Sequence, residues 1–200
     1  FKNLKKFIHN RSFVSSLIRN VASMYTLSSK GFKNSVILNY NSNLNDLGYW
    51  YRQLVGESLG KKGKGITPIV SPAPKGHHSV LQLYLDGPKD KFFTFFSSSN
   101  ENDKYKVSGK IIPNTMSFLK NKKLNSIIQA QCNATKNIFN VQGIPFRHFV
   151  FKKKDEEELG MFFTFFVLET ILLAQIMNIN PFDQPAVEKI KIETKKILSQ

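Results

Sequence analysis

The chain has 200 residues, of which 41% are hydrophobic, and its 29 Lys and Arg against 14 Asp and Glu give a formal net charge of +15. This length fits one large domain with a real core. The single Cys132 excludes an internal disulfide and favours a reducing compartment, so the cytoplasm is the location that we expect. The positive charge is compatible with polyanions or phosphorylated metabolites and does not choose between them.

The first segment, which begins at Phe1, has lysines but no continuous apolar run with a small-residue cleavage site. We therefore expect no signal peptide. Because no initiator methionine is present, we expect a fragment of a longer protein, although a processed chain would look the same.

Apolar spacing predicts that helices and strands alternate from the start of the chain. In order, the first half predicts a helix over 13–27, a strand over 35–40, a helix from Asn43 or Asn45 to Gly60, a strand over 66–70, a helix over 76–85 and a strand over 92–96. Either asparagine can cap the second helix, and Gly60 is typical of a helix end.

The second half continues this alternation after a polar, irregular stretch at 97–108. It predicts a helix over 115–140, a strand over 144–151, a strongly apolar helix over 160–178 and a final helix over 184–198. Strands separated by helices need crossover connections, which build a parallel sheet covered on both faces. The predicted fold class is α/β, a three-layer αβα sandwich with a mostly parallel sheet, in one domain without internal repeats.

The apolar helix over 160–177 is near the lower length limit of a membrane span. Glu169 would then lie near the centre of the bilayer, at a cost of several kcal/mol. A helix buried against the sheet explains the same pattern without that cost. We therefore expect no contact with a membrane.

The stretch 56–79 concentrates the reactive side chains of the chain. Glu57 ends a helix, Lys61 opens a Gly/Lys loop and the pair His77-His78 begins the next helix. These groups suit proton transfer on an anionic substrate, although an ordinary helix pair between Glu57 and Lys61 would also explain the carboxylate. The histidines lack other ligands at metal-binding spacing and the loop lacks the Walker pattern, so we expect no metal and no cofactor.

Other polar side chains have simpler explanations. The run Ser97-Ser98-Ser99-Asn100 follows a strand and could hold a phosphate, but no helix opens behind it and a flexible loop explains it better. His148 is expected to be a packed core or edge histidine. The lysines of the final helix, at 189, 191, 195 and 196, are expected to form a solvated face.

Three segments together resemble the glucose-6-phosphate isomerase family. They are Gly56-Glu57-Ser58-Leu59-Gly60-Lys61, Gly76-His77-His78-Ser79 with Gln82-Leu83, and Asn180-Pro181-Phe182-Asp183-Gln184-Pro185-Ala186-Val187-Glu188 with Lys191. The chain is similar over nearly its whole length to the C-terminal half of that enzyme. The resemblance implies a second sugar-isomerase (SIS) domain of flavodoxin-like fold over 1–180 and a closing active-site helix over 181–200.

The resemblance places the family's functional residues on this chain. The acid/base role falls on Glu57 and the ring-opening role on His78, with Gln184 and Lys191 as active-site residues and Lys61 as a substrate-binding cation. Glu57 would move a proton between C1 and C2 of the open-chain sugar phosphate through an enediol, which interconverts glucose 6-phosphate and fructose 6-phosphate without a cofactor.

The chain departs from the family's pattern at Leu59, where Asn is frequent, and at Ala186, where Gly is frequent. The first SIS domain, which in the family supplies a Ser/Thr-rich phosphate cradle and an active-site arginine, lies outside this chain. We therefore expect the 200 residues alone to have little or no isomerase activity.

The order of the elements separates two of these residues. Glu57 precedes the strand over 66–70 and His78 follows it, so they should lie at opposite edges of the sheet, roughly 16 Å apart. That distance is too long for both to hold one sugar. Lys191 is expected to join Glu57, and His78 a site completed by a second copy, because the resembled family is a homodimer that shares this histidine.

Two other functions stay open. A sugar-phosphate-binding SIS module of a regulator would keep its ligand binding when Glu57 is replaced by Gln. A nucleic-acid-binding domain would explain the charge, but the sequence lacks a helix-turn-helix, a stacking platform and a basic helix with interleaved aromatics. We therefore expect no nucleic-acid partner.

Overall fold

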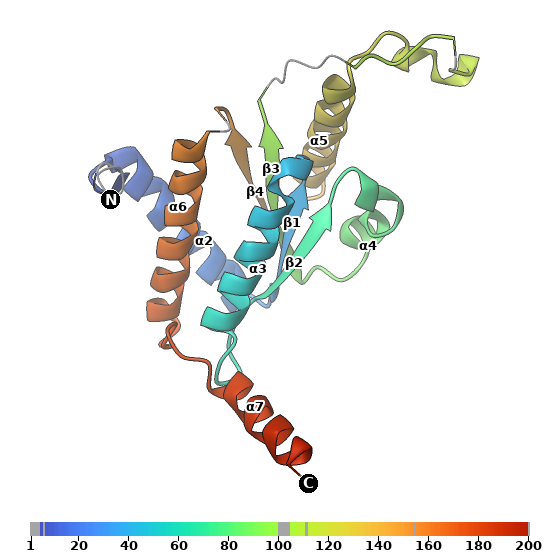
Figure 1. Ribbon diagram of the computed structural model, residues 1–200. Helices are drawn as coiled ribbons and strands as arrows, with labels where there is room; N and C mark the ends of the chain where they lie inside the picture. Colours follow the sequence, from blue (N-terminus) through green and yellow to red (C-terminus); the bar gives the residue numbers. More distant parts are fainter. Residues whose placement is uncertain (1–4, 6, 100–104, 111, 154, 200) are drawn as a thin grey trace.

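A computed structural model describes residues 5, 7–99, 105–110, 112–153 and 155–199 (Figure 1). The elements are, in order, α2 Arg11–Ser29, β1 Asn34–Asn39, η1 Ser42–Leu44, α3 Asn45–Leu59, β2 Thr67–Pro72, η2 Lys75–His78, α4 Leu81–Asp86, β3 Lys91–Ser98, η3 Asn114–Leu119, α5 Leu124–Val141, β4 Phe146–Phe151, α6 Glu156–Ile176 and α7 Pro185–Leu198, where η denotes a 3₁₀ helix.

The four strands form one parallel sheet in the order β2-β1-β3-β4. Asn34 at the start of β1 lies opposite Thr67 of β2 on one side and Lys91 of β3 on the other. All strands therefore start at one edge, the amino edge, and end at the other, the carboxyl edge. Helices connect successive strands, as parallel pairing requires. The predicted α/β class with a parallel sheet is confirmed.

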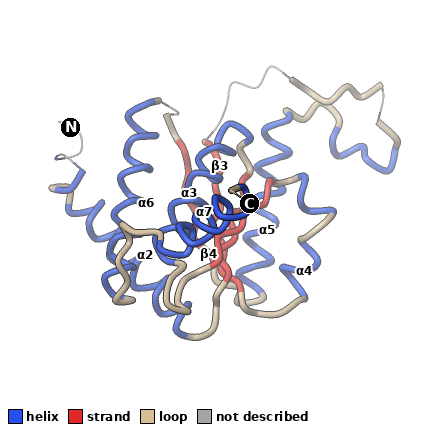
Figure 2. The backbone as a smooth tube through the Cα atoms, turned by 60° about the horizontal axis from the view of Figure 1, so that its bottom comes forward, coloured by secondary structure: helices blue, strands red, loops and turns tan. Residues whose placement is uncertain are grey.

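Helices cover both faces of the sheet. Alternate residues of β1 separate the two cores: Ile37 belongs to the larger core with α2, α3 and α6, while Val36 and Leu38 belong to the smaller one with α4 and α5. Figure 2 shows α2 and α6 on one side of the sheet and α4 and α5 on the other. This is the predicted three-layer sandwich, with the hydrophobic strand residues buried on both faces.

Two predicted helices are each divided in the structure. The range 76–85 consists of the short turn η2 and α4, so the histidine pair lies in a 3₁₀ turn rather than at a helix start. The range 115–140 consists of η3 and α5. Asn121, between these two, has a φ of 61°, and this left-handed conformation cannot continue a right-handed helix.

The predicted cap of α3 was also wrong. Neither Asn43 nor Asn45 caps this helix, whose first residue follows Leu44 without a side-chain cap. The side chain of Asn41 instead accepts a hydrogen bond of 3.1 Å from the amide of Asn43, at the start of η1. The short 3₁₀ turn thus moves the capping position upstream of α3.

Helix α6 is long and apolar enough, by length and composition alone, to cross a membrane. Buried core helices of soluble proteins have the same properties, and one face of α6 packs in the larger core through Phe166 and Leu173. Glu169, in the middle of the helix, is also wholly buried. Its carboxylate therefore needs a partner inside the protein.

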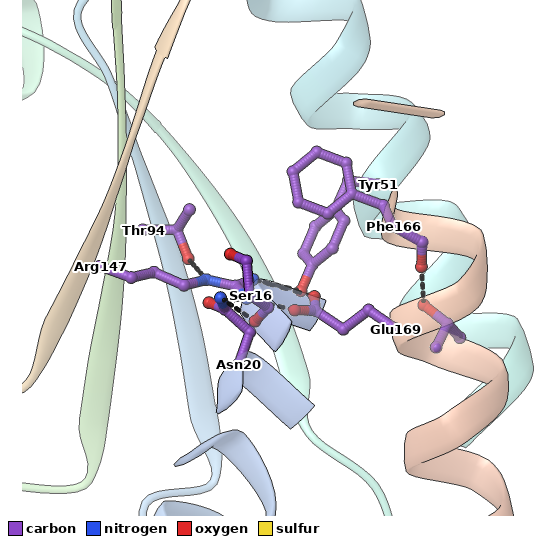
Figure 3. A network of polar contacts seen from close by, with 8 residues as sticks. Ser16, Asn20, Tyr51, Thr94, Arg147, Phe166 and Glu169 are labelled. Carbon is purple, nitrogen blue, oxygen red and sulfur yellow. Dashed lines mark hydrogen bonds and ion pairs between the residues drawn. The ribbon is translucent and has the colours of Figure 1, made fainter. Parts of the chain in front are cut away.

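That partner is Arg147 of β4 (Figure 3). Nη1 and Nη2 of the guanidinium donate to the two carboxylate oxygens of Glu169, and Nε donates to Thr94 Oγ1 at 2.9 Å. Tyr51 and Asn20 accept the other hydrogen bonds. Burial opposes the charge of Arg147, but the facing carboxylate outweighs it and raises the pKa of the guanidinium. The ion pair thus joins β4 to α6, and the hydrogen bonds of the same guanidinium join them to α2 and α3.

Candidate active site

Glu57 lies in the last turn of α3, where two amide groups hold its carboxylate. Gln53, one turn earlier, donates to Oε1 at 3.0 Å, and Gln184, at the start of α7, donates to Oε2 at 2.8 Å. The carboxylate is exposed rather than buried. Both donors are neutral amides, so they fix the orientation of the carboxylate without neutralising its charge. A carboxylate held in this way is available as a base.

A pocket of about 250 Å³ lies beside this carboxylate. It is formed by two segments that are far apart in sequence: the end of α3 with its following loop, and the connection from α6 to α7. The lining residues are Gly56, Glu57, Gly60, Lys61, Lys62, Ile179, Asn180, Asp183, Gln184, Pro185, Ala186 and Val187. Two of the three segments that carry the family resemblance thus meet at one concave surface.

Lys61 fastens these two segments together. Its ammonium donates to the carbonyl oxygen of Asn180 at 2.6 Å and pairs with Asp183 at 2.9 Å, and its side chain is only 9% exposed. The ammonium therefore positions the start of α7 against α3. Lys62, which also lines the pocket and is exposed, is a cation that sequence reasoning overlooked.

The loop after α3 needs its glycines to reach the strand that follows. Gly65 has a φ of 129°, and a Cβ there would lie 2.9 Å from the carbonyl oxygen of Leu59. Only glycine fits such a conformation at that distance. The loop therefore folds tightly over the end of α3, which keeps Lys61 and Lys62 next to Glu57.

Lys191 does not join this pocket. Helix α7 begins at the pocket with Pro185 and projects away from the sheet (Figure 1). Lys191 lies six residues further, about 9 Å along the helix axis. Its ammonium lies 3.4 Å from the carboxylate of Glu188, and both side chains are exposed. The expectation that Lys191 meets Glu57 does not hold within the described residues of this chain.

His78 lies at the other edge of the sheet. A Cβ at Gly56, next to Glu57, would lie 4.0 Å from Pro68 near the start of β2, whereas a Cβ at Gly76 would lie 3.1 Å from Ser71 near its end. The six residues of β2 span roughly 20 Å. The structure thus agrees with the predicted separation, and Figure 1 shows the end of α3 and the turn before α4 at opposite ends of β2.

Ser97 and His148 form a second polar cluster, which is not arranged as a nucleophile and base. Nδ1 of His148 lies 3.4 Å from the ammonium of Lys136, which can only donate, so the ring proton is on Nε2. This nitrogen lies 2.7 Å from Ser97 Oγ and donates to it, whereas a general base would accept. Ser97 is 1% exposed, so no substrate reaches it.

The possible phosphate cradle at Ser97 to Asn100 does not form in its first three residues, and Asn100 lies outside the part of the chain that the structure describes. Ser97 and Ser98 are buried residues of β3, and Ser99 Oγ lies 3.5 Å from the carbonyl oxygen of Phe151 on the neighbouring strand. The flexible loop that was expected there is therefore wrong for Ser97 and Ser98. His148 is a packed histidine, as predicted.

This packing of His148 predicts a pH dependence of stability. Burial and, to a smaller extent, the charge of Lys136 lower the pKa of His148 from 6.5 to about 4. Between these values the unfolded chain binds a proton that the folded chain does not, so the contribution of His148 to stability is complete above pH 6.5 and lost as the pH falls toward 4.

Urea unfolding at pH 7 and pH 5 measures this contribution. The free energy of unfolding of the wild type should fall more between the two pH values than that of His148→Gln. His9→Gln, which removes an exposed histidine, should behave like the wild type. An identical pH dependence for the wild type and His148→Gln would show that His148 titrates normally in the folded protein.

The fold and the pocket define an α/β domain with a carboxylate site at the amino edge of a parallel sheet. No family model matches the chain. Curated relatives do match it: the glucose-6-phosphate isomerase of Methanocaldococcus jannaschii is 34% identical over 177 residues, 88% of this chain and 43% of the relative. That of Campylobacter jejuni is 32% identical over 82% of this chain and 42% of the relative. The chain is thus related to glucose-6-phosphate isomerases over most of its length.

Two solved structures share the fold. A hypothetical protein from Thermus thermophilus superposes with a TM-score of 0.89 at 22% identity, over 100% of this chain and 49% of that protein. A glucose-6-phosphate isomerase from Chlamydia trachomatis superposes with a TM-score of 0.70 at 15% identity, over 84% of this chain and 35% of that protein. The chain spans about two-fifths of the length of the curated relatives above.

Proposed function

We propose that this chain is the C-terminal part of a glucose-6-phosphate isomerase, which interconverts glucose 6-phosphate and fructose 6-phosphate in glycolysis and gluconeogenesis. The relationship to curated isomerases supports this reaction, and the pocket at Glu57 supplies a base for it. The reaction needs only proton transfers, so the proposed enzyme uses no metal and no cofactor. We place it in the cytoplasm, where its substrates are made and the lone cysteine stays reduced.

The observation that carries the proposal is the hydrogen bond that Gln184 donates to the carboxylate of Glu57, which lies 127 positions earlier in the chain. In the proposed step the carboxylate removes the proton from C2 of the open-chain aldose while the carbonyl oxygen O1 takes up a proton, which leaves a neutral enediol. The carboxylic acid then returns its proton to C1 while the hydroxyl on C2 releases its proton, so that the C2 carbonyl of the ketose forms. One base that serves both carbons must stay at a fixed position between them, and the amides of Gln53 and Gln184 provide this.

The other site residues take the roles that the family resemblance gives them. Gln184 binds substrate as well as orienting Glu57. The ammonium of Lys61 pairs with Asp183, so Lys61 would contribute to substrate binding indirectly, by holding the loop after α3 in place. Lys191 would act near the ring oxygen or the developing charge. In this chain it lies beyond the pocket, so the remainder of the protein would have to complete its surroundings.

His78 would assist ring opening in a site other than the one that contains Glu57 of the same chain. The roughly 20 Å between the two edges of the sheet supports this separation. We therefore propose a homodimer in which each site takes Glu57 from one copy and His78 from its partner. The first SIS domain, outside this chain, would supply the phosphate-binding residues, while residues 1–180 form the second SIS domain and 181–200 the closing helix.

An assay of the complete protein tests this proposal. Purified complete protein should convert fructose 6-phosphate to glucose 6-phosphate, and the 200-residue chain should have little or no activity. Regulatory binding would instead give saturable binding of the sugar phosphate by the complete protein with no conversion in either direction. That outcome would replace the isomerase by a sugar-phosphate-binding module.

A further inference from the structure

The two adjacent histidines of the turn η2 have different surroundings. His78 is exposed, whereas His77 is partly buried and its Nε2 lies 2.6 Å from the hydroxyl of Tyr40, just after β1. Tyr40 is itself 4% exposed and stacks on Phe95 of β3. The turn is thus attached to the sheet through His77, while the ring of His78 is left free at its surface.

The hydrogen bonds of this attachment have one direction. The Thr135 hydroxyl donates its single proton to the carbonyl oxygen of Gln131 in α5, at 2.9 Å. Thr135 Oγ1 therefore accepts from Tyr40, also at 2.9 Å. Because that bond uses the only proton of Tyr40, the tyrosine oxygen must accept from Nε2–H of His77. The chain of donors runs from His77 through Tyr40 and Thr135 to the backbone of α5.

The surroundings keep His77 neutral. Burial first, and then the neighbouring His78, lower the pKa of the His77 ring. Tyr40 also interacts electrostatically with Cys132 of α5, which in turn interacts with Lys136. Burial raises the pKa of Tyr40 well above its ordinary value and that of Cys132 to about 11, so both are uncharged at pH 7. A neutral ring with its proton on Nε2 satisfies every bond of the chain.

We propose that His77 is a positioning residue for His78: Tyr40 and Thr135 hold its ring, which fixes the turn that presents His78 to the sugar. This inference rests on the proposed isomerase function, since it assigns a purpose to His78. The two histidines thus have different roles: His77 stays neutral and anchored, and His78 is the histidine of this turn that accepts and returns a proton during ring opening. The His77 ring supplies orientation and takes no part in the proton transfer.

A first test does not depend on catalysis. Side-chain ¹⁵N NMR of the complete protein should show His77 protonated on Nε2 only at pH 7. Tyr40→Phe removes the acceptor, so His77 should then become a mixture of tautomers. Tyr84→Phe, which removes a hydroxyl from another buried tyrosine of the same core, should leave the His77 signals unchanged. A wild-type His77 protonated on Nδ1, or a mixture there, would overturn the inference.

A second test measures the effect on the reaction. In the complete protein, Tyr40→Phe should lower kcat for fructose 6-phosphate on the order of tenfold by loosening His78, with little change in KM. Tyr84→Phe should keep the wild-type kcat. An unchanged kcat in Tyr40→Phe would remove the positioning role even if the NMR result held. Absence of activity in the wild type would instead defeat the proposed function, and the tautomer of His77 would still decide the arrangement of the turn.

Discussion

Replacing Glu57 with Gln is expected to lower kcat of the complete protein by about 10² to 10⁴, the usual contribution of a general base. Glutamine has nearly the same shape and cannot accept the proton from carbon. Its carbonyl oxygen can still accept from Gln184, whose bond to Glu57 is 2.8 Å long, and Gln53 can turn its own amide oxygen toward the new NH₂ group, so the pocket should keep its shape and KM should change little. Steady-state kinetics with fructose 6-phosphate measure both constants.

Glu193→Gln is the matched control. This carboxylate is on α7, is exposed and lies 3.8 Å from Lys196. The same chemical change there should leave kcat and KM unaffected. Retained turnover in Glu57→Gln would remove Glu57 from the mechanism, whereas equal losses in both variants would indicate a general effect of charge.

The second large effect concerns stability. Replacing Glu169 with Gln is expected to lower the free energy of unfolding by about 3 to 5 kcal/mol, because it leaves the charge of Arg147 inside the protein without an opposite charge. The hydrogen bonds to Thr94 and Tyr51 remain but cannot replace the carboxylate. Urea unfolding followed by circular dichroism provides the measurement.

Two further variants separate charge from packing. Glu188→Gln breaks an exposed pair with Lys191 and should cost less than about 1 kcal/mol. The double replacement of Arg147 and Glu169 by Leu removes both charges and should be more stable than Glu169→Gln, since apolar residues often substitute for a buried pair without loss. If Glu169→Gln cost no more than Glu188→Gln, the buried pair would not hold the core together.

The sheet could be predicted because its pattern is local. Each buried strand is a short apolar run between segments whose apolar residues recur with the period of a helix. The alternation of strands and helices itself requires parallel pairing. The interruption at Asn121 was missed because apolar residues continue on both sides of it, and periodicity does not report a single left-handed residue. The cap of α3 was misplaced because Asn41, Asn43 and Asn45 offer the same capping side chain, and the sequence does not show which of them a helix follows.

The candidate site was harder to predict because its contacts join distant segments. Composition and spacing singled out Glu57, but the donors that hold it include Gln184 from the far end of the chain. Glu169 was anomalous in an apolar helix, yet nothing local named Arg147 as its partner. Lys191 was expected next to Glu57 because the preceding helix returns the chain to the amino edge of the sheet. The direction in which α7 leaves the pocket depends instead on the ion pair between Lys61 and Asp183, which no spacing rule describes.

In the proposed enzyme, each working site takes its carboxylate from one copy of the protein and its imidazole from the other. Mixing the complete Glu57→Gln and His78→Asn proteins, each expected to be nearly inactive alone, tests it most directly after dissociation and reassociation. Random pairing makes half of the dimers mixed, and each mixed dimer has one intact site of two, so activity should return to about a quarter of the wild-type value. A mixture that stays as inactive as its components would show that the two groups do not serve a shared site.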